Sequence, residues 1–138
     1  MTFRIWRRER MFTPQEVINQ YIESGLVLRE TTLSGDYKKG NKEGKKLVQV
    51  FKILETDLDL AEQTLPELLS NENVVTRTNA AVDCLSLNIN IEKAVDVLEQ
   101  ASSDERNGIF GFNAEMTLKV WREQGYLKVY PEQEIVPR

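Results

Sequence analysis

Residues 37–58 read YKKGNKEGKKLVQVFKILETDL, and this stretch indicates the fold class. Along it, apolar residues and glycines recur at steps of three and four, which is the spacing of one face of an α-helix. They are Tyr37, Gly40, Gly44, Leu47, Phe51, Leu54 and Leu58. Asp36, directly before the stretch, is a favourable helix N-cap. The pattern predicts a long helix whose stripe faces the core. Two glycines one turn apart on this stripe predict close approach by the backbone of another helix.

A phosphate-binding loop is the alternative for the glycine- and lysine-rich part of this stretch. A Walker loop needs four residues between its glycines, a Ser or Thr after its Lys, and a preceding strand. Here three residues separate Gly40 from Gly44, and Lys46 follows Lys45. The helical interpretation is therefore favoured.

Further helices are predicted on both sides of this one. A capping box at Thr13 and Glu16 begins the first, with Pro14 at its first position. The others are predicted from position 57 or 59 to 69, over about 74–87, from 91 to about 101, and over 109–124. Gly125 is placed to end the last helix. No hairpin pattern interrupts the series, so the sequence predicts an all-α chain of about six helices.

Composition bounds the domain count and the chemistry. The 138 residues, 41% of them hydrophobic, are enough for one globular domain. The absence of His and the presence of a single Cys, Cys84, exclude Ser-His-Asp and Cys-His catalysis, His-ligated metal sites and intrachain disulfides. Carboxylates pair at Asp57 with Asp59 and at Asp104 with Glu105, where helix capping is favoured over acid–base catalysis. We therefore expect no enzyme activity, no cofactor and no metal, and a core position for Cys84.

Charge is divided unevenly along the chain, whose net charge is −4. Residues 1–52 carry 11 Lys and Arg against 6 Asp and Glu, whereas residues 53–138 carry 7 against 16. The acidic second half disfavours direct contact with nucleic acid and suits a basic protein partner, although acidity also commonly serves solubility.

The ends of the chain differ from its middle. Residues 1–12 form a basic extension in which aromatic residues alternate with Arg4, Arg7, Arg8 and Arg10. We favour a helix extension or a loosely ordered arm here over a nucleic-acid contact. No apolar run reaches the length of a signal or membrane segment, so a cytoplasmic protein without membrane contact is expected.

The segment at residues 65–85, LPELLSNENVVTRTNAAVDCL, resembles a HEAT repeat. In such a repeat the second of two helices carries an Arg shortly before small residues, here Arg77 before Ala80-Ala81, where neighbouring repeats stack. Asn113-Ala114 repeats Asn79-Ala80 after 34 residues, a spacing that suits helix pairs. The resemblance implies a short HEAT/armadillo-like α-solenoid of about six helices. An irregular helical bundle is the alternative.

A wider resemblance rests on the helix start Gly35-Asp36-Tyr37-Lys38-Lys39 and on residues 108–121, GIFGFNAEMTLKVW. The chain resembles a bacterial family of small all-helical proteins without assigned function, which close on Gly-Phe-Asn-Ala-Glu-Met-Thr-Leu-x-x-Trp. The match covers residues 13–125, taken as the helical domain, and leaves 126–138 as an irregular tail. Such proteins look like immunity proteins encoded beside secreted toxins, including nucleases of contact-dependent growth inhibition. The family implies no catalytic residues.

The resemblance implies a protein-binding immunity protein that holds a basic toxin domain in a tight, inactive complex. A generic helical scaffold or regulator without a toxin partner is the alternative. We expect the partner to meet carboxylates on the second helices of the pairs and in their flanking turns. The candidates are Glu72, Asp83, Asp104 and Glu115.

Overall fold

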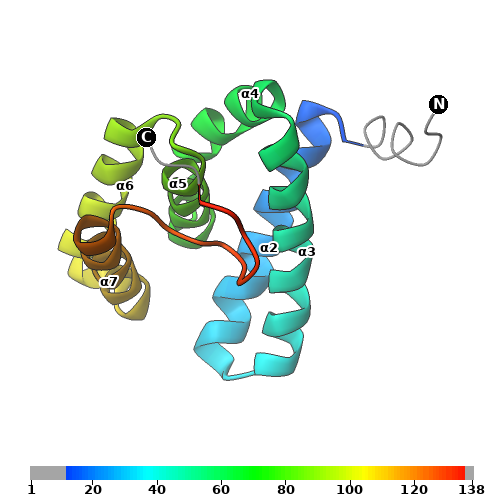
Figure 1. Ribbon diagram of the computed structural model, residues 1–138. Coiled ribbons are helices and arrows are strands. Elements are labelled where there is room, and N and C mark those ends of the chain that lie inside the picture. Colours follow the sequence, from blue (N-terminus) through cyan, green and yellow to red (C-terminus); the bar gives the residue numbers. More distant parts are fainter. Residues whose placement is uncertain (1–11, 136–138) are drawn as a thin grey trace, which may run out of the picture.

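The computed structural model describes residues 12–135, in which helices follow one another without a strand (Figure 1). They are α2 (Pro14–Ser34), α3 (Tyr37–Thr56), α4 (Leu58–Leu68), α5 (Val74–Leu87), α6 (Ile91–Ser103), the 3-10 helix η1 (Glu105–Asn107) and α7 (Ile109–Gln124). The prediction of an all-α chain is confirmed. The four arginines of the predicted N-terminal extension lie outside the described residues.

The helix ends are formed by the caps that the sequence indicates. The backbone N–H of Thr13 donates to Glu16 Oε1 at 2.8 Å, and that of Glu16 donates to Thr13 Oγ1 at 3.2 Å. Asp36 and Asp57 accept hydrogen bonds from backbone N–H groups in the first turns of α3 and α4. Gly125 ends α7 at a φ of 86°, which glycine adopts without a steric penalty. Short local motifs therefore account for where these helices begin and end.

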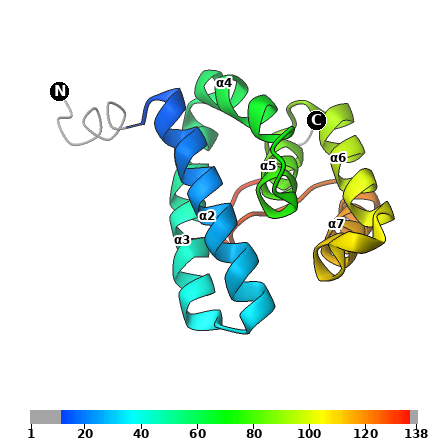
Figure 2. The same cartoon turned by 180° about the vertical axis from the view of Figure 1, so that it is seen from behind.

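α5 lies at the centre of the molecule. α2 and α3 form an antiparallel hairpin on one side, and α6 and α7 form a second helix pair on the other (Figures 1 and 2). α5 contacts both pairs and α4. It buries Ala80, Ala81, Cys84 and Leu85 almost completely, and the small size of the first three lets its neighbours pack closely. The expectation of a core position for Cys84 is confirmed.

The stripe predicted on α3 faces the core only in the C-terminal half of the helix. Phe51 and Leu54 are fully buried, whereas Tyr37 at the helix start is 76% exposed. A Cβ placed on Gly44 would have no atom within 4 Å, so the prediction that Gly44 packs against another helix is wrong. In the N-terminal half of α3 the buried residue is Glu43, whose side chain turns toward α2.

The closest packing through glycine occurs at Gly25 in α2. A Cβ there would lie 1.9 Å from Thr76 Oγ1 and 3.3 Å from Thr76 Cα, so α2 and α5 approach this closely because residue 25 has no side chain. Gly111 in α7 similarly lies against the backbone carbonyl of Ala101 in α6. On the α3 stripe itself, Gly40 also lies close to α2, because an added Cβ would be 2.9 Å from Thr31 Oγ1. The predicted close contact between helices is therefore present at Gly40 and absent at Gly44.

Residues 126–135, here called the C-terminal strap, have no regular secondary structure but pack back onto the helices. In Figure 1 the strap runs from α7 past α5 to α3. Gln133 Nε2 donates to Ser86 Oγ on α5 at 2.7 Å, and the Tyr130 hydroxyl donates to Glu55 on α3. The strap therefore connects α3 with α5.

Candidate protein-binding surfaces

The four carboxylates predicted to meet a partner have different surroundings. Glu72 lies in the turn before α5 and Glu115 lies on α7, and both are exposed. Asp104 is partly buried between α6 and η1, and Asp83 is buried on α5. The structure therefore does not place them as one row of exposed charges.

Asp83 is not a surface carboxylate, so the prediction that it contacts a partner as an exposed charge is wrong. It is 7% exposed, and its Oδ2 accepts a hydrogen bond from the Tyr21 hydroxyl on α2. Burial raises the pKa of Asp83 to about 7, although the hydrogen bond from Tyr21 acts in the opposite direction. The physical reason is that α5 is covered by α2 on this side, so an acidic position on α5 faces another helix.

Asp104 is already engaged within the chain. It accepts a hydrogen bond from the backbone N–H of Arg106 at 3.0 Å, and its two oxygens meet the Arg106 guanidinium at 3.0 and 2.8 Å. These hydrogen bonds lower the pKa of Asp104 to about 2. Asp57 likewise caps α4 by accepting from Leu60 N–H at 3.1 Å. The capping interpretation of both carboxylates is confirmed.

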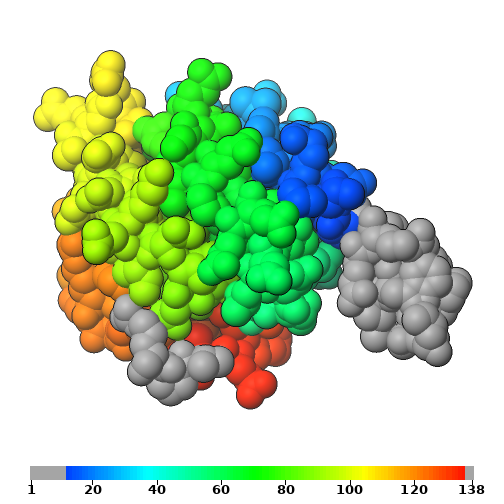
Figure 3. Space-filling view, turned by 90° about the horizontal axis from the view of Figure 1, so that it is seen from above, coloured from blue at the N-terminus to red at the C-terminus, as the bar shows by residue number. Residues whose placement is uncertain are grey.

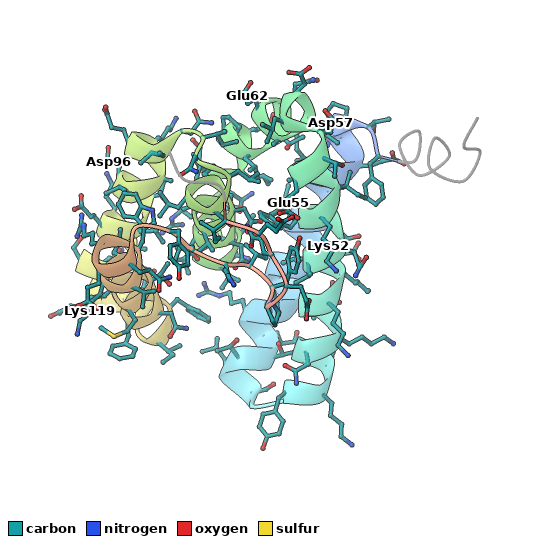
Figure 4. The ribbon with its side chains drawn as sticks, viewed as in Figure 1. Lys52, Glu55, Asp57, Glu62, Asp96 and Lys119 are labelled. Carbon is teal, nitrogen blue, oxygen red and sulfur yellow. The ribbon has the colours of Figure 1, made fainter. Side chains whose placement is uncertain are left out.

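Exposed carboxylates gather on α4, the turn after it and α6, which lie on one side of the molecule with the start of α5 between them (Figure 3). We call this surface the acidic face and define it by five exposed residues: Glu62, Glu67, Glu72, Glu92 and Asp96. Within residues 12–135, none of the five has a Lys or Arg nitrogen within salt-bridge distance. In Figure 4 Glu62 and Asp96 lie at the periphery of α4 and α6. Arg77 and Lys93 line a cavity together with Glu72 and Asp96, so the five carboxylates outnumber these two cations and the face is negative overall.

Helical phase could have located the α6 part of this face from the sequence. Ala94, Leu98 and Ala101 are buried, and residues on the opposite side of the same turns then point to solvent. Glu92 and Asp96 are on that side. The prediction places partner contacts on the second helices α5 and α7. Glu115 on α7 is exposed and Asp83 on α5 is buried, whereas the acidic face lies on the first helices α4 and α6 and in the turn that follows α4.

α3 carries the opposite charge. Its first turns expose four lysines: Lys38, Lys39, Lys42 and Lys45. Glu43, which is surrounded by them in the sequence, is buried and accepts a hydrogen bond from Ser24 Oγ at 2.8 Å. Lys46 Nζ lies 3.3 Å from the other Glu43 oxygen. The inward turn of Glu43 leaves this half of α3 with a positive surface.

A groove runs along α2, with the first half of α3 on one side and α5 and α7 on the other. Leu28 of α2 lies at its centre and lines three adjoining cavities, the largest of about 780 Å³. The open space at Gly44 belongs to this groove. Asn79 of α5 and Asn113 of α7, the two residues of the repeated Asn-Ala step, line the same cavity. The second helices of two pairs therefore meet at the groove.

No metal site and no membrane-spanning helix is found in the part of the chain that the structure describes. Within residues 12–135, no three His, Cys, Asp or Glu side chains are grouped so that they could hold a metal ion. No helix there is both long and apolar enough to cross a membrane.

Comparison of the chain with known protein families, curated proteins and solved structures found no match. The resemblance to immunity proteins therefore remains a hypothesis.

Proposed function

We propose that this chain is an immunity protein that binds and neutralises a basic toxin domain through its acidic face. The observation that carries the proposal is the excess of exposed carboxylates on α4, α6 and the turn between α4 and α5, where five carboxylates outnumber Arg77 and Lys93 and none is within salt-bridge distance of a described Lys or Arg. A basic partner surface complements such a face, and complementary charge accelerates association and selects the partner. The link to toxin neutralisation rests on the resemblance of residues 35–39 and 108–121.

Inhibition requires no chemistry by this chain. A nuclease presents Lys and Arg side chains to the phosphates of its substrate, and these are the groups that an acidic surface attracts. Glu62 and Asp96, on separate helices of the face, would pair with such cations and thereby keep nucleic acid out. The proposed mechanism is therefore occlusion of a phosphate-binding surface.

The experiment uses the product of the gene immediately upstream, expressed in a bacterial host with and without this chain. We expect growth arrest by that product alone and rescue by the wild-type chain. The double variant Glu62→Lys/Asp96→Lys should slow association about tenfold or more at low ionic strength and weaken rescue. The matched control is Glu23→Lys/Glu30→Lys on α2, where both residues are exposed and the change in charge is the same. We expect the control to associate within about twofold of the wild type.

Two outcomes would contradict different parts of the proposal. An upstream product that neither arrests growth nor binds the chain contradicts the immunity function and favours a helical scaffold without a toxin. If the wild-type chain protects the host but the acidic-face variant and the control variant associate at equal rates, the immunity function stands and only the role of the acidic face is contradicted. Glu115 on α7 is then the next carboxylate to reverse.

A further inference from the structure

The groove between α3, α5 and α7 plays no part in the contact proposed above. Its walls are largely apolar: Leu28 lines all three of its cavities, Val82 of α5 lines two, and Val48 of α3 lines two. Gly44 widens it, because a side chain at this position would project into the space beside Val48. An apolar segment of a partner could therefore enter without displacing atoms of the chain.

A buried donor in the groove has no acceptor. Asn79 lines two of the three cavities, and its Nδ2 is buried without a hydrogen-bond partner among the described residues. A buried N–H donor without an acceptor is costly, so native proteins rarely leave one unpaired. A carbonyl or carboxylate oxygen of a bound polypeptide would supply the missing acceptor.

Exposed positive charges outnumber exposed negative charges around the groove. Lys45 lines its largest cavity, and Lys128 of the strap lines another. The Arg29 guanidinium lies 5.5 Å from the centre of the Phe110 ring, which lines the third cavity. An acidic segment complements these three cations.

Two carboxylates line the groove, and only one of them is exposed. Asp36 accepts a hydrogen bond from the backbone N–H of Lys39, and Asp83 accepts one from the Tyr21 hydroxyl. Asp83 is buried and offers no surface charge, whereas Asp36 is exposed and keeps its negative charge, so the three cations face one exposed carboxylate.

We infer that the groove is a docking site for an amphipathic, acidic segment of a partner polypeptide. Its apolar side chains lie against Leu28, Val48 and Val82, its carboxylates meet Lys45 and Lys128, and one of its oxygens accepts from Asn79. This inference goes beyond the proposed function, because it concerns a different surface and a segment of the opposite charge. It holds whether or not the partner is a toxin.

The probe is a synthetic peptide of about 15 residues, long enough to form a helix. It carries Leu along one face and Glu on the flanks of that face, and a matched peptide carries Lys in place of each Glu. Binding to the full chain is measured by fluorescence anisotropy at low ionic strength. We expect the Glu peptide to bind at least about tenfold more tightly than the Lys peptide.

Two charge variants locate the interaction. Lys45→Glu/Lys128→Glu should weaken binding of the Glu peptide about tenfold or more. Lys93→Glu/Lys119→Glu makes the same change of charge at two exposed lysines of α6 and α7 that line none of the three cavities. This control should bind within about twofold of the wild type.

Filling the groove gives an independent test. Gly44→Leu should fold normally, since the position is open, and should weaken binding of the Glu peptide about tenfold or more. Circular dichroism checks the fold, and the side-chain amide NMR signal of Asn79 should shift when the Glu peptide binds to the wild type. The proposal is overturned by absence of saturable binding, by equal binding of the two peptides, or by a folded Gly44→Leu variant that binds like the wild type. An unmoved Asn79 signal on binding equally overturns it.

Discussion

At Gly25 the absence of one methyl group determines how closely α2 can approach α5. An added Cβ would lie 1.9 Å from Thr76 Oγ1, and Thr76 is fully buried, so neither helix can shift freely. We predict that Gly25→Ala lowers the free energy of unfolding by about 1–3 kcal/mol through overpacking. Urea denaturation followed by circular dichroism measures this.

Two further variants test that explanation. Thr76→Ala in the Gly25→Ala background should recover most of the loss, because it removes the atom that the new methyl group meets. Gly44→Ala should instead stabilise the chain by up to about 1 kcal/mol, since the position is open and Ala is favoured over Gly inside a helix. A Gly25→Ala variant as stable as the wild type would show that α2 and α5 are not in close contact.

Asp83 makes stability depend on pH in an unusual direction for a carboxylate. Its pKa is raised by burial from the ordinary value of 3.8 to about 7. Between these values the unfolded chain has released the proton while the folded chain retains it, so the Asp83 contribution to stability decreases as pH rises from about 4 to 7. We predict that Asp83→Asn removes this part of the pH dependence, as measured by urea midpoints at pH 5 and pH 7.5.

Exposed carboxylates provide the control for Asp83. Glu62→Gln should leave the difference between the two urea midpoints unchanged, because Glu62 is exposed on α4. If the Asp83→Asn variant shows the same difference between its two urea midpoints as the wild type, the titration does not belong to Asp83. Asp83→Lys should unfold the chain, because it places an unpaired charge against Tyr21 in the core.

Among the elements, the C-terminal strap depends on one buried amide. Gln133 is 4% exposed, its Nε2 donates to Ser86 Oγ at 2.7 Å, and its Oε1 accepts from the Val129 N–H at 2.6 Å. We predict that Gln133→Ala lowers the free energy of unfolding by about 1–3 kcal/mol, because it leaves a backbone donor without its partner. Glu132→Ala, at the exposed neighbouring position, should have little effect. Equal stability of both variants in thermal unfolding would mean that the strap contributes nothing measurable.

The helices were more predictable from the sequence than the strap. Thr13, Asp36 and Asp57 each cap a helix by accepting from the backbone N–H three positions further on, and such local chemistry can be read in a short window. The strap is held by contacts with Glu55 and Ser86, far away in the sequence. No periodic pattern encodes those contacts, so the sequence predicted an irregular tail but not its packing. Figure 4 shows Glu55 and Lys52 on the side of α3 that the strap meets.

α3 shows where periodicity misleads. The spacing of its stripe is correct, and Phe51 and Leu54 are buried as expected. In the first half of the helix Gly40 and Glu43 face α2, and the buried Glu43 accepts a hydrogen bond from Ser24. A glycine has no side chain that would indicate a buried or an exposed face. The spacing alone therefore predicts a core position for Gly44, although this residue lines the groove.

Positive and negative side chains lie mainly on different surfaces of the molecule. The division of charge between the two halves of the sequence becomes a division in space, with lysines on the first half of α3 and carboxylates on α4 and α6. The sequence predicted the acidic half but not which of its residues are exposed, because exposure depends on how α5 is enclosed by its neighbours. Asp83 illustrates this, since it is acidic, central and buried.

The acidic face and the groove share no residue, and this separation predicts how their variants combine. In a complex that uses both surfaces, Glu62→Lys/Asp96→Lys should mainly slow association, because exposed charges steer the encounter. Gly44→Leu should mainly accelerate dissociation, because it removes packing made after the encounter. The two losses of binding free energy should add within about 0.5 kcal/mol, as expected for sites without common partners.

Surface plasmon resonance with the partner identified by co-expression separates the two rate constants for each variant and for their combination. Raising the salt concentration should slow association of the wild type and of Gly44→Leu alike, because both retain the acidic face. It should slow association of the acidic-face variant much less. A combined loss well below the sum of the separate losses would mean that the partner reaches the groove and the acidic face through one coupled contact, and the two surfaces would then form a single binding site.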